Sequence, residues 1–262
     1  MTRTYAASDR FSDSDVTLDA FLGGKIVIAQ PKDGYRAGVD PVFLAAAVAA
    51  RPGQSVLELG CGAAPALCCL GARVDGLSLT GIEIQDAYAD LGQRNLDQNE
   101  LGGRVYNADL TALPENVKAC RFDHVIANPP YFDRAHGHKA ADTGRETALG
   151  GETPLLRWVE VAARRLKPGG YATFIQRVER LPEMLAGFSQ HLGSLELLPL
   201  SPRVAQPPRL VILRGRKEGK TPFKLHVPVI LHDGERHEKD TDCYTAQIRA
   251  ILREGASLSF SG

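Results

Sequence analysis

From residue 55 onward, short apolar runs alternate with amphipathic stretches, and this alternation constrains the fold more than any other feature. The apolar runs predict strands at 55–59, 79–84, 104–110, 122–127 and 171–176. The stretches between them predict helices at 65–74, 86–99 and 153–168, the last with Thr153 as its cap and Gly169 after its end. Apolar strands that alternate with helices at this spacing favour a parallel sheet covered on both faces.

The segments on either side have a different pattern. Residues 1–18 are polar and acidic and contain no apolar signal-peptide core, so we expect a flexible lead-in. Residues 19–52 predict a hairpin around Gly23-Gly24, then a helix with Asp40 as its N-cap and Pro41 at its first position. After residue 193, the runs 194–200, 208–215 and 223–231 suit antiparallel pairing at a sheet edge. A short helix over 245–254 follows.

Composition limits the class of protein. The chain of 262 residues is 44% hydrophobic and 24% charged, with zero formal net charge, which is typical of a globular protein with a real core. No apolar run is long enough to cross a bilayer. The five cysteines form no C-x-x-C pair and the histidines have no metal-ligand spacing, so we expect reduced thiols, a cytoplasmic location and no metal site. Zero net charge neither indicates nor excludes a nucleic-acid partner.

Glycines mark the end of the first strand of the alternation. Glu58 is followed by Gly60-Cys61-Gly62, at the point where the strand must turn into a helix. Glycines there allow a tight turn and a close approach of the backbone to a ligand. The third glycine that is common in such loops is replaced by Ala64, and Pro65 follows it. This change disfavours a pyrophosphate cradle and leaves room for a methionine moiety.

Acidic residues close the next two strands. Glu83 ends the second strand, where a carboxylate can accept hydrogen bonds from both ribose hydroxyls of an adenosine cofactor. Asp109 ends the third strand, and its carboxylate or neighbouring backbone is expected to meet the adenine ring. Ile84 and Leu110, the residues that follow, join this expected cofactor set.

Asn128-Pro129-Pro130-Tyr131 follows the fourth strand and carries the chemistry. The two prolines fix the backbone and remove two N–H donors, so the loop presents carbonyl groups. A planar amine or amide nitrogen is a poor nucleophile because its lone pair is delocalised. Hydrogen bonds from its N–H groups to the Asn128 side-chain oxygen and the Pro129 carbonyl direct that lone pair toward a methyl donor. Tyr131 can stack on the planar target.

These motifs resemble the class I S-adenosylmethionine-dependent methyltransferases that carry an N-P-P-[YF] loop. A narrower resemblance, to the bacterial family that methylates adenine N6 in valine tRNA beside the anticodon, covers nearly the whole chain. It rests on DAFLGGKIVIAQPKDGYRAGVDPVFLAA, on LELGCGAAPA and FDHVIANPPYF, and on PPRLVILRGRK and YTAQIRAIL. The resemblance implies that Gly60, Gly62 and Glu83 bind S-adenosylmethionine and that Asp109 contacts its adenine. It also implies that Tyr35 to Gly38, with Arg36, and Asp40 close over the cofactor.

The resemblance implies an α/β, Rossmann-like class I methyltransferase fold. We expect a mostly parallel seven-stranded sheet with antiparallel C-terminal strands, plus the N-terminal hairpin and helix. The expected units are the lead-in 1–18, the hairpin and helix 19–52, which pack on the core, and the S-adenosylmethionine-dependent methyltransferase domain 53–262.

Two basic regions bear on an RNA partner, which the resemblance identifies as tRNA. The region 203–224 is rich in Arg and Lys and includes Arg203, Arg209 and Arg216, while the long polar loop 132–152 carries Arg134 and Lys139. These side chains suit contacts with phosphates. A solvated edge strand protected by charges explains the region 203–224 equally well.

Other functions remain open at this stage. A protein glutamine methyltransferase needs the same N-P-P-Y loop, although only about fifty residues precede the first core strand here, which leaves little room for a helical recognition domain. A non-catalytic nucleotide-binding protein and a dehydrogenase use related folds. Trp158 lies on the apolar stripe of its helix, and we expect it to belong to the core. The oligomeric state does not follow from the sequence.

Overall fold

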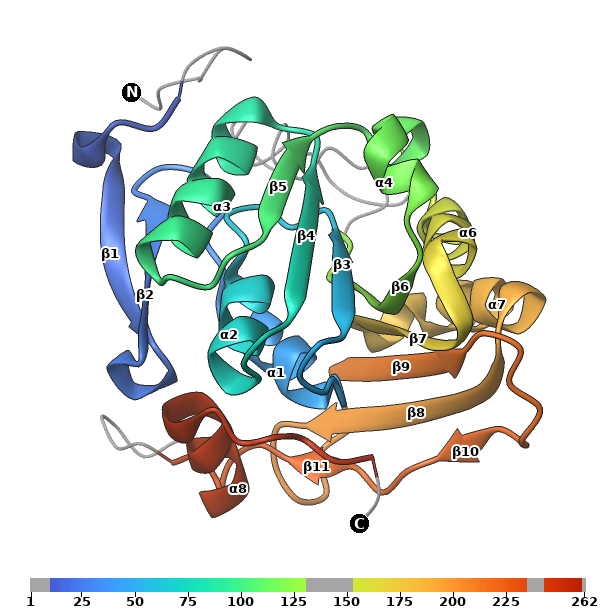
Figure 1. The fold of residues 1–262 in the computed structure, drawn as a ribbon. Coiled ribbons are helices and arrows are strands. Elements are labelled where there is room, and N and C mark those ends of the chain that lie inside the picture. Colours follow the sequence, from blue (N-terminus) through green and yellow to red (C-terminus); the bar gives the residue numbers. More distant parts are fainter. Residues whose placement is uncertain (1–9, 131–152, 235–242, 261–262) are drawn as a thin grey trace.

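A central mixed sheet organises the protein (Figure 1). The computed structural model describes residues 10–130, 153–234 and 243–260. The sheet has nine strands in the order β10-β8-β9-β7-β6-β3-β4-β5, with β11 paired to β8. Their bounds are β3 Ser55–Leu59, β4 Ser78–Glu83, β5 Arg104–Asn107, β6 Phe122–Ala127, β7 Leu166–Arg177, β8 Gly193–Ser201, β9 Leu210–Arg216, β10 Lys224–Leu225 and β11 Val229–Ile230. Only β9 runs antiparallel to its neighbours.

Helices cover both faces of this sheet, as the alternation predicted. Their bounds are α1 Asp40–Ala47, α2 Pro65–Arg73, α3 Asp86–Gln98, α4 Glu115–Ala119, α6 Leu155–Arg165, α7 Leu181–His191 and α8 Ala246–Arg249, which continues as a π-helical turn over Ala250–Glu254. Val56 and Leu57 are both buried, and they belong to different cores because consecutive strand residues face opposite sides. Helices α1, α2, α3 and α8 share the Val56 core, and α4, α6 and α7 share the Leu57 core.

The predicted fold class is confirmed, with differences at the edges. The seven strands from β8 to β5 are the predicted sheet, and β10 and β11 add two short strands beyond it. The run 223–231 was predicted as one antiparallel strand, but it forms two short strands parallel to β8. Pro228 lies between them and has no N–H to donate to the ladder. Helices α4 and α7 were not predicted.

Several predicted element ends also shift. β1 (Val16–Phe21) and β2 (Ile26–Pro31) form the expected hairpin, but β1 begins inside the predicted lead-in. Asp40 is the first residue of α1 rather than its cap. At α6 the cap position belongs to Pro154 rather than Thr153, and no side chain caps the helix. β5 ends at Asn107, so Asp109 lies beyond the strand.

Asn95 attaches the hairpin to the core. This fully buried residue of α3 accepts a hydrogen bond from Ala29 N at 2.8 Å and donates to Ala29 O at 3.0 Å. Its amide also donates to Ala63 O at 2.9 Å, in the loop that precedes α2. One side chain therefore satisfies backbone groups of two segments that are far apart in sequence, and it sets the position of the hairpin beside the glycine loop.

We predict that Asn95→Ala lowers the free energy of unfolding by about 2 kcal/mol, because buried backbone groups lose their partners. Asn116→Ala is the matched control, since within the described residues the Asn116 side chain bonds the Tyr106 hydroxyl in an exposed position. Chemical denaturation followed by circular dichroism measures both. Equal effects of the two substitutions would contradict the role given to Asn95.

Candidate active site

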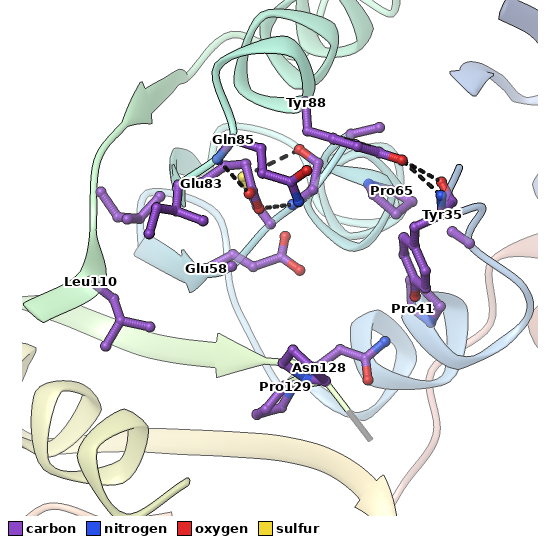
Figure 2. A pocket seen from close by; sticks show the side chains of 18 of the residues that line it. Tyr35, Pro41, Glu58, Pro65, Glu83, Gln85, Tyr88, Leu110, Asn128 and Pro129 are labelled. Carbon is purple, nitrogen blue, oxygen red and sulfur yellow. Dashed lines mark hydrogen bonds between the residues drawn. The ribbon is translucent and has the colours of Figure 1, made fainter. Parts of the chain in front are cut away.

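A cavity opens where β3, β4 and β6 end, between the glycine loop and the N-terminal segment (Figure 2). The carboxyl ends of parallel strands meet at one edge of the sheet, and ligands of open α/β folds bind there. The cavity is lined by Gln30, Tyr35, Ala37, Pro41, Glu58, Gly60, Cys61, Gly62, Ala63, Pro65, Ile82, Glu83, Ile84, Gln85, Tyr88, Ala108, Asp109, Leu110, Asn128, Pro129, Pro130, Thr153 and Trp158. The predicted cofactor residues are all in this set except Arg36, Gly38 and Asp40.

The turn after β3 has the left-handed backbone that its glycines suggested. Gly60 has φ +63° and Gly62 has φ +54°, and Ala64 adopts φ +60° although it carries a Cβ. A Cβ on Gly60 would lie 2.5 Å from the Trp158 ring, so only glycine fits against this indole. Ala64 therefore preserves the conformation of the glycine that it replaces, at a cost of about 1 kcal/mol.

Glu83 connects the ends of two loops. Its carboxylate accepts hydrogen bonds from Gly62 N and Gln85 N, both at 2.9 Å. Burial raises the pKa of Glu83 above its ordinary value, and the backbone N–H groups oppose this shift. Each carboxylate oxygen can accept more than one hydrogen bond, so Glu83 retains capacity for ligand hydroxyl groups.

Glu58 lies deeper, at 3% exposure, and one of its oxygens lacks a partner. Burial raises its pKa well above the ordinary value, the backbone N–H of Leu67 opposes the shift, and Glu83 adds to it through charge repulsion. Within the described residues, Glu58 Oε2 is buried without a hydrogen bond. A buried acceptor of this kind calls for a donor beyond the described residues.

The Asn128-Pro129-Pro130 loop closes the other end of the cavity, where Figure 2 shows Asn128 opposite Glu58. Asn128 Oδ1 is the second buried oxygen in the cavity that has no partner among the described residues. The Pro129 carbonyl accepts a hydrogen bond from Gln176 Nε2 at 3.1 Å, and the Pro130 carbonyl accepts one from Arg180 at 2.9 Å. The loop is thus fixed by its carbonyl groups while the Asn128 oxygen stays open. Tyr131 lies outside the described residues.

The N-terminal segment contributes Tyr35 rather than Arg36. Tyr35 N donates to the Tyr88 hydroxyl at 2.8 Å, and that hydroxyl donates to Tyr35 O at 3.1 Å. Burial, with the charges of Asp40 and Glu58, raises the pKa of Tyr35 to about 12. Arg36 instead pairs with Asp19 at 2.6 Å within the hairpin.

Arg36 does not line the cavity, and a cofactor contact from this residue stays a prediction. Asp40 does not line the cavity either, and it acts on the site through its charge near Tyr35.

Asp109 lines the cavity, and its side chain caps a short 3-10 helix. Its Oδ1 accepts from Thr111 N at 2.7 Å and from the Thr111 hydroxyl at 2.8 Å, and so begins the short 3-10 helix Leu110–Ala112. Leu110 and Ile84 line the cavity beside it, and Ile84 is 60% exposed although apolar. A flat apolar group such as a nucleobase ring suits this arrangement better than a charged one does.

The three described basic residues that were predicted for substrate binding do not form one patch. Arg209 is exposed at the carboxyl edge, where its carbonyl accepts from Val178 N just after β7. Arg203 is buried and donates to the carbonyls of Asp233 and Gly234, so it serves the fold. Arg216, the last residue of β9, lies toward the opposite edge, where its register partners are Tyr171 in the first half of β7 and Gly193, the first residue of β8. Arg134 and Lys139 lie outside the described residues.

Trp158 was predicted to belong to the core, and it does, but it also forms part of the cavity wall against Gly60. Tyr88, Gln85 and Pro41 were not predicted for the site. Tyr88 lies in a predicted helix, but no sequence signal placed it beside Tyr35, which lies 53 residues away.

Within the described part of the chain, no group of three or more His, Cys, Asp or Glu residues is arranged to hold a metal ion. Within the same residues, no helix is both long and apolar enough to cross a membrane.

The cavity suits an adenosine cofactor that carries a positive charge. Two buried carboxylates, the exposed apolar edge at Ile84 and a left-handed backbone turn surround the same space. Glu58 Oε2 and Asn128 Oδ1 are acceptors that await donors. These groups fit S-adenosylmethionine, whose amino group and ribose hydroxyls are donors and whose sulfonium is cationic.

Residues 38–198 match the family described as the methyltransferase small domain. The chain belongs to this family. It is accordingly an S-adenosylmethionine-dependent methyltransferase, and the matched segment includes the glycine loop, Glu83 and the Asn128-Pro129-Pro130 loop.

Curated relatives carry a more specific name. The methyltransferase is 26% identical over 148 residues to the "tRNA1(Val) (adenine(37)-N6)-methyltransferase" of Flavobacteriaceae bacterium strain 3519-10, covering 56% of this chain and 63% of the relative. A protein of the same name from Shewanella halifaxensis is 27% identical over 190 residues, covering 70% and 75%. The match to the first of these spans less than two thirds of its length.

Solved structures show the same fold. A predicted O-methyltransferase from Agrobacterium tumefaciens superimposes with a TM-score of 0.67 at 22% identity, covering 84% of this chain and 98% of that one. The 16S rRNA N2 G1207 methyltransferase of T. thermophilus, in complex with AdoMet and guanosine, gives a TM-score of 0.53 at 19% identity, covering 78% and 50%.

We predict opposite effects of Glu58→Gln on cofactor binding and on stability. The loss of a charge-assisted contact should raise the Kd for S-adenosylmethionine about tenfold or more. The pKa of Glu58 is higher in the folded protein than in the unfolded chain, because burial disfavours the ionised carboxylate. Folding stability is therefore greatest below the unfolded pKa, where the carboxyl is protonated in both states, and it is lost as the pH rises through the folded pKa. At pH 8 the cofactor-free variant should therefore melt at a higher temperature than the wild type, and the difference should shrink toward pH 4.

Calorimetric titration and thermal melts across this pH range measure the two effects. A variant that is less stable than the wild type at pH 8 would contradict the assignment of a desolvated carboxylate at position 58.

Proposed function

We propose that this methyltransferase acts on N6 of an adenine in tRNA, beside the anticodon, and works in the cytoplasm. The observation that carries the proposal is the Asn128-Pro129-Pro130 loop, whose open Asn128 oxygen faces the same cavity as Glu58. An exocyclic amine has two N–H groups to satisfy, and the loop offers an amide oxygen and a backbone carbonyl. The names of the curated relatives support the choice of adenine and tRNA.

In this proposal the cofactor lies along the ends of β3 and β4. Glu83 accepts from the ribose hydroxyls, Glu58 faces the cationic methionine end, and the side chains near Asp109 and Leu110 border the adenine. Gly60 and Gly62 allow the backbone to approach, with Cys61 buried behind them against Gly81 of β4. When bound, S-adenosylmethionine supplies an electrophilic methyl group.

The remaining steps belong to the protein. Asn128 Oδ1 and the Pro129 carbonyl accept the two N–H groups of the target amine and so turn its lone pair toward the methyl group. The attacking nitrogen becomes acidic as the bond forms, so no strong base is required. Positioning and electrostatics supply the acceleration. The stacking role of Tyr131 stays a prediction from the sequence.

RNA contacts are proposed at the carboxyl edge. Arg209 is exposed there, next to the end of β7, which also carries the exposed Arg177. Phosphate contacts from this edge would orient the tRNA over the Asn128 loop. Arg216 is excluded from this role because it lies at the other end of β9.

We predict that wild-type enzyme transfers labelled methyl from S-adenosylmethionine to tRNA as N6-methyladenosine, and that Asn128→Ala lowers kcat about 100-fold or more with cofactor binding retained. The assay uses total tRNA and, in parallel, total protein, followed by digestion and nucleoside analysis. Label in protein alone would favour a glutamine methyltransferase, which needs the same loop. Near-normal turnover of Asn128→Ala would contradict the nitrogen-binding role.

We predict that Arg209→Ala weakens tRNA binding several-fold and reduces the log-log salt dependence of the affinity by about one unit, as expected for one lost phosphate contact. Arg216→Ala is the matched control and should leave both quantities near wild type. Binding titrations at several salt concentrations measure them. An equal loss in both variants would contradict an interface confined to the carboxyl edge.

A further inference from the structure

We propose that Gln176 is a positioning residue for methyl transfer, because it holds the Pro129 carbonyl in the orientation that the target nitrogen needs. The inference rests on the proposed role of the Asn128-Pro129-Pro130 loop. It adds a residue 47 positions away in sequence that touches neither cofactor nor target.

Gln176 is fully buried near the end of β7. Its Nε2 donates to the Pro129 carbonyl at 3.1 Å, and its Oε1 accepts from Arg177 N at 2.8 Å. The second bond fixes the orientation of the amide. If the side chain were flipped, the Gln176 NH2 group would face the N–H of Arg177, and two donors would meet without an acceptor. The donor group therefore has one orientation, toward Pro129.

The loop has few other means of attachment. Pro129 and Pro130 have no backbone N–H, so carbonyl groups are their only backbone hydrogen-bonding atoms. Gln176 takes one acceptor site of the Pro129 carbonyl and leaves the second for an N–H of the target. Without this bond the peptide plane can rotate, and a displacement of about 1 Å at a reacting group costs about 100-fold in rate.

A neighbouring ion pair holds the next residue of the loop. Arg180 donates to the Pro130 carbonyl at 2.9 Å and pairs with Glu183 at 2.7 Å. Glu183 in turn accepts from Leu155 N at 3.2 Å, at the start of α6. Gln176 and Arg180 thus fix two successive carbonyl groups of the loop, and among the described residues Asn128 Oδ1 stays open.

The test compares Gln176→Met, Gln176→Glu and the control Gln54→Met. Methionine keeps the volume of glutamine and removes the donor. Gln54 is also a glutamine that accepts from a backbone N–H, of Arg51 at 2.8 Å, but it precedes β3 at the opposite edge of the sheet. Methyl transfer is measured on the acceptor that the wild type labels, tRNA or protein, together with the KM and Kd for S-adenosylmethionine.

We expect Gln176→Met to lower kcat about 10- to 100-fold with an unchanged KM and Kd for the cofactor, while Gln54→Met keeps kcat within about twofold of wild type. In Gln176→Glu, the protonated carboxyl group donates to Pro129 and the ionised one repels it. The kcat of this variant relative to wild type should therefore rise as the pH falls. A purely structural role would instead make the melting temperature of Gln176→Glu fall in parallel with kcat as the pH rises, so thermal melts at each pH separate the two roles. This arm holds even if Gln176→Met folds poorly.

A Gln176→Met kcat within twofold of wild type, parallel losses of kcat and cofactor affinity, or a flat pH ratio for Gln176→Glu would each overturn the inference and leave the tRNA proposal intact. Labelling of protein alone would overturn the tRNA proposal, and Gln176 would then be tested on that acceptor. A wild type that labels neither acceptor would overturn both.

Discussion

The site depends on one buried carboxylate. Glu83 accepts the N–H of Gly62 and the N–H of Gln85, and so joins the glycine loop after β3 to the turn after β4. Burial alone would drive this carboxyl toward its neutral form, and the backbone donors offset part of that cost. Because both turns converge on the same side chain, the cavity has a fixed wall before any ligand enters. Trp158 supports that wall from α6, by packing against Gly60.

Elsewhere in the cavity, some polar groups have hydrogen-bond partners within the described residues and others do not. The carbonyls of Pro129 and Pro130 have partners, and Tyr35 is tied to Tyr88. Glu58 Oε2 and Asn128 Oδ1 have none among the described residues. An unsatisfied buried acceptor costs about 1–3 kcal/mol, and a ligand donor that enters the cavity would remove this cost. Ala64 in a left-handed conformation adds backbone strain to the same loop.

Much of the site could be predicted from sequence because its parts lie where strands end. Glu58, Glu83 and Asn128 each follow or close an apolar run, and these runs pair as parallel neighbours. Side chains whose partners are remote were predicted less well. Arg36 sits near the cavity in sequence, but Asp19 draws it into the hairpin. Arg203 looked like a phosphate ligand, yet its charge is bound to buried carbonyls. Local pattern also predicted one strand over 223–231, where Pro228 separates two, and it did not predict helix α7.

The sequence by itself determined the layered fold and the order of the loops at its active edge. Periodicity identifies buried parallel strands, and parallel strands bring their carboxyl ends together whatever the intervening helices are. Only the tertiary structure decided which edge each arginine reaches, because β9 runs against its neighbours and carries Arg209 and Arg216 to opposite ends. It also decided that Gln176 would meet Pro129. That contact requires the registration of β7 beside β6, which no local pattern in the chain records.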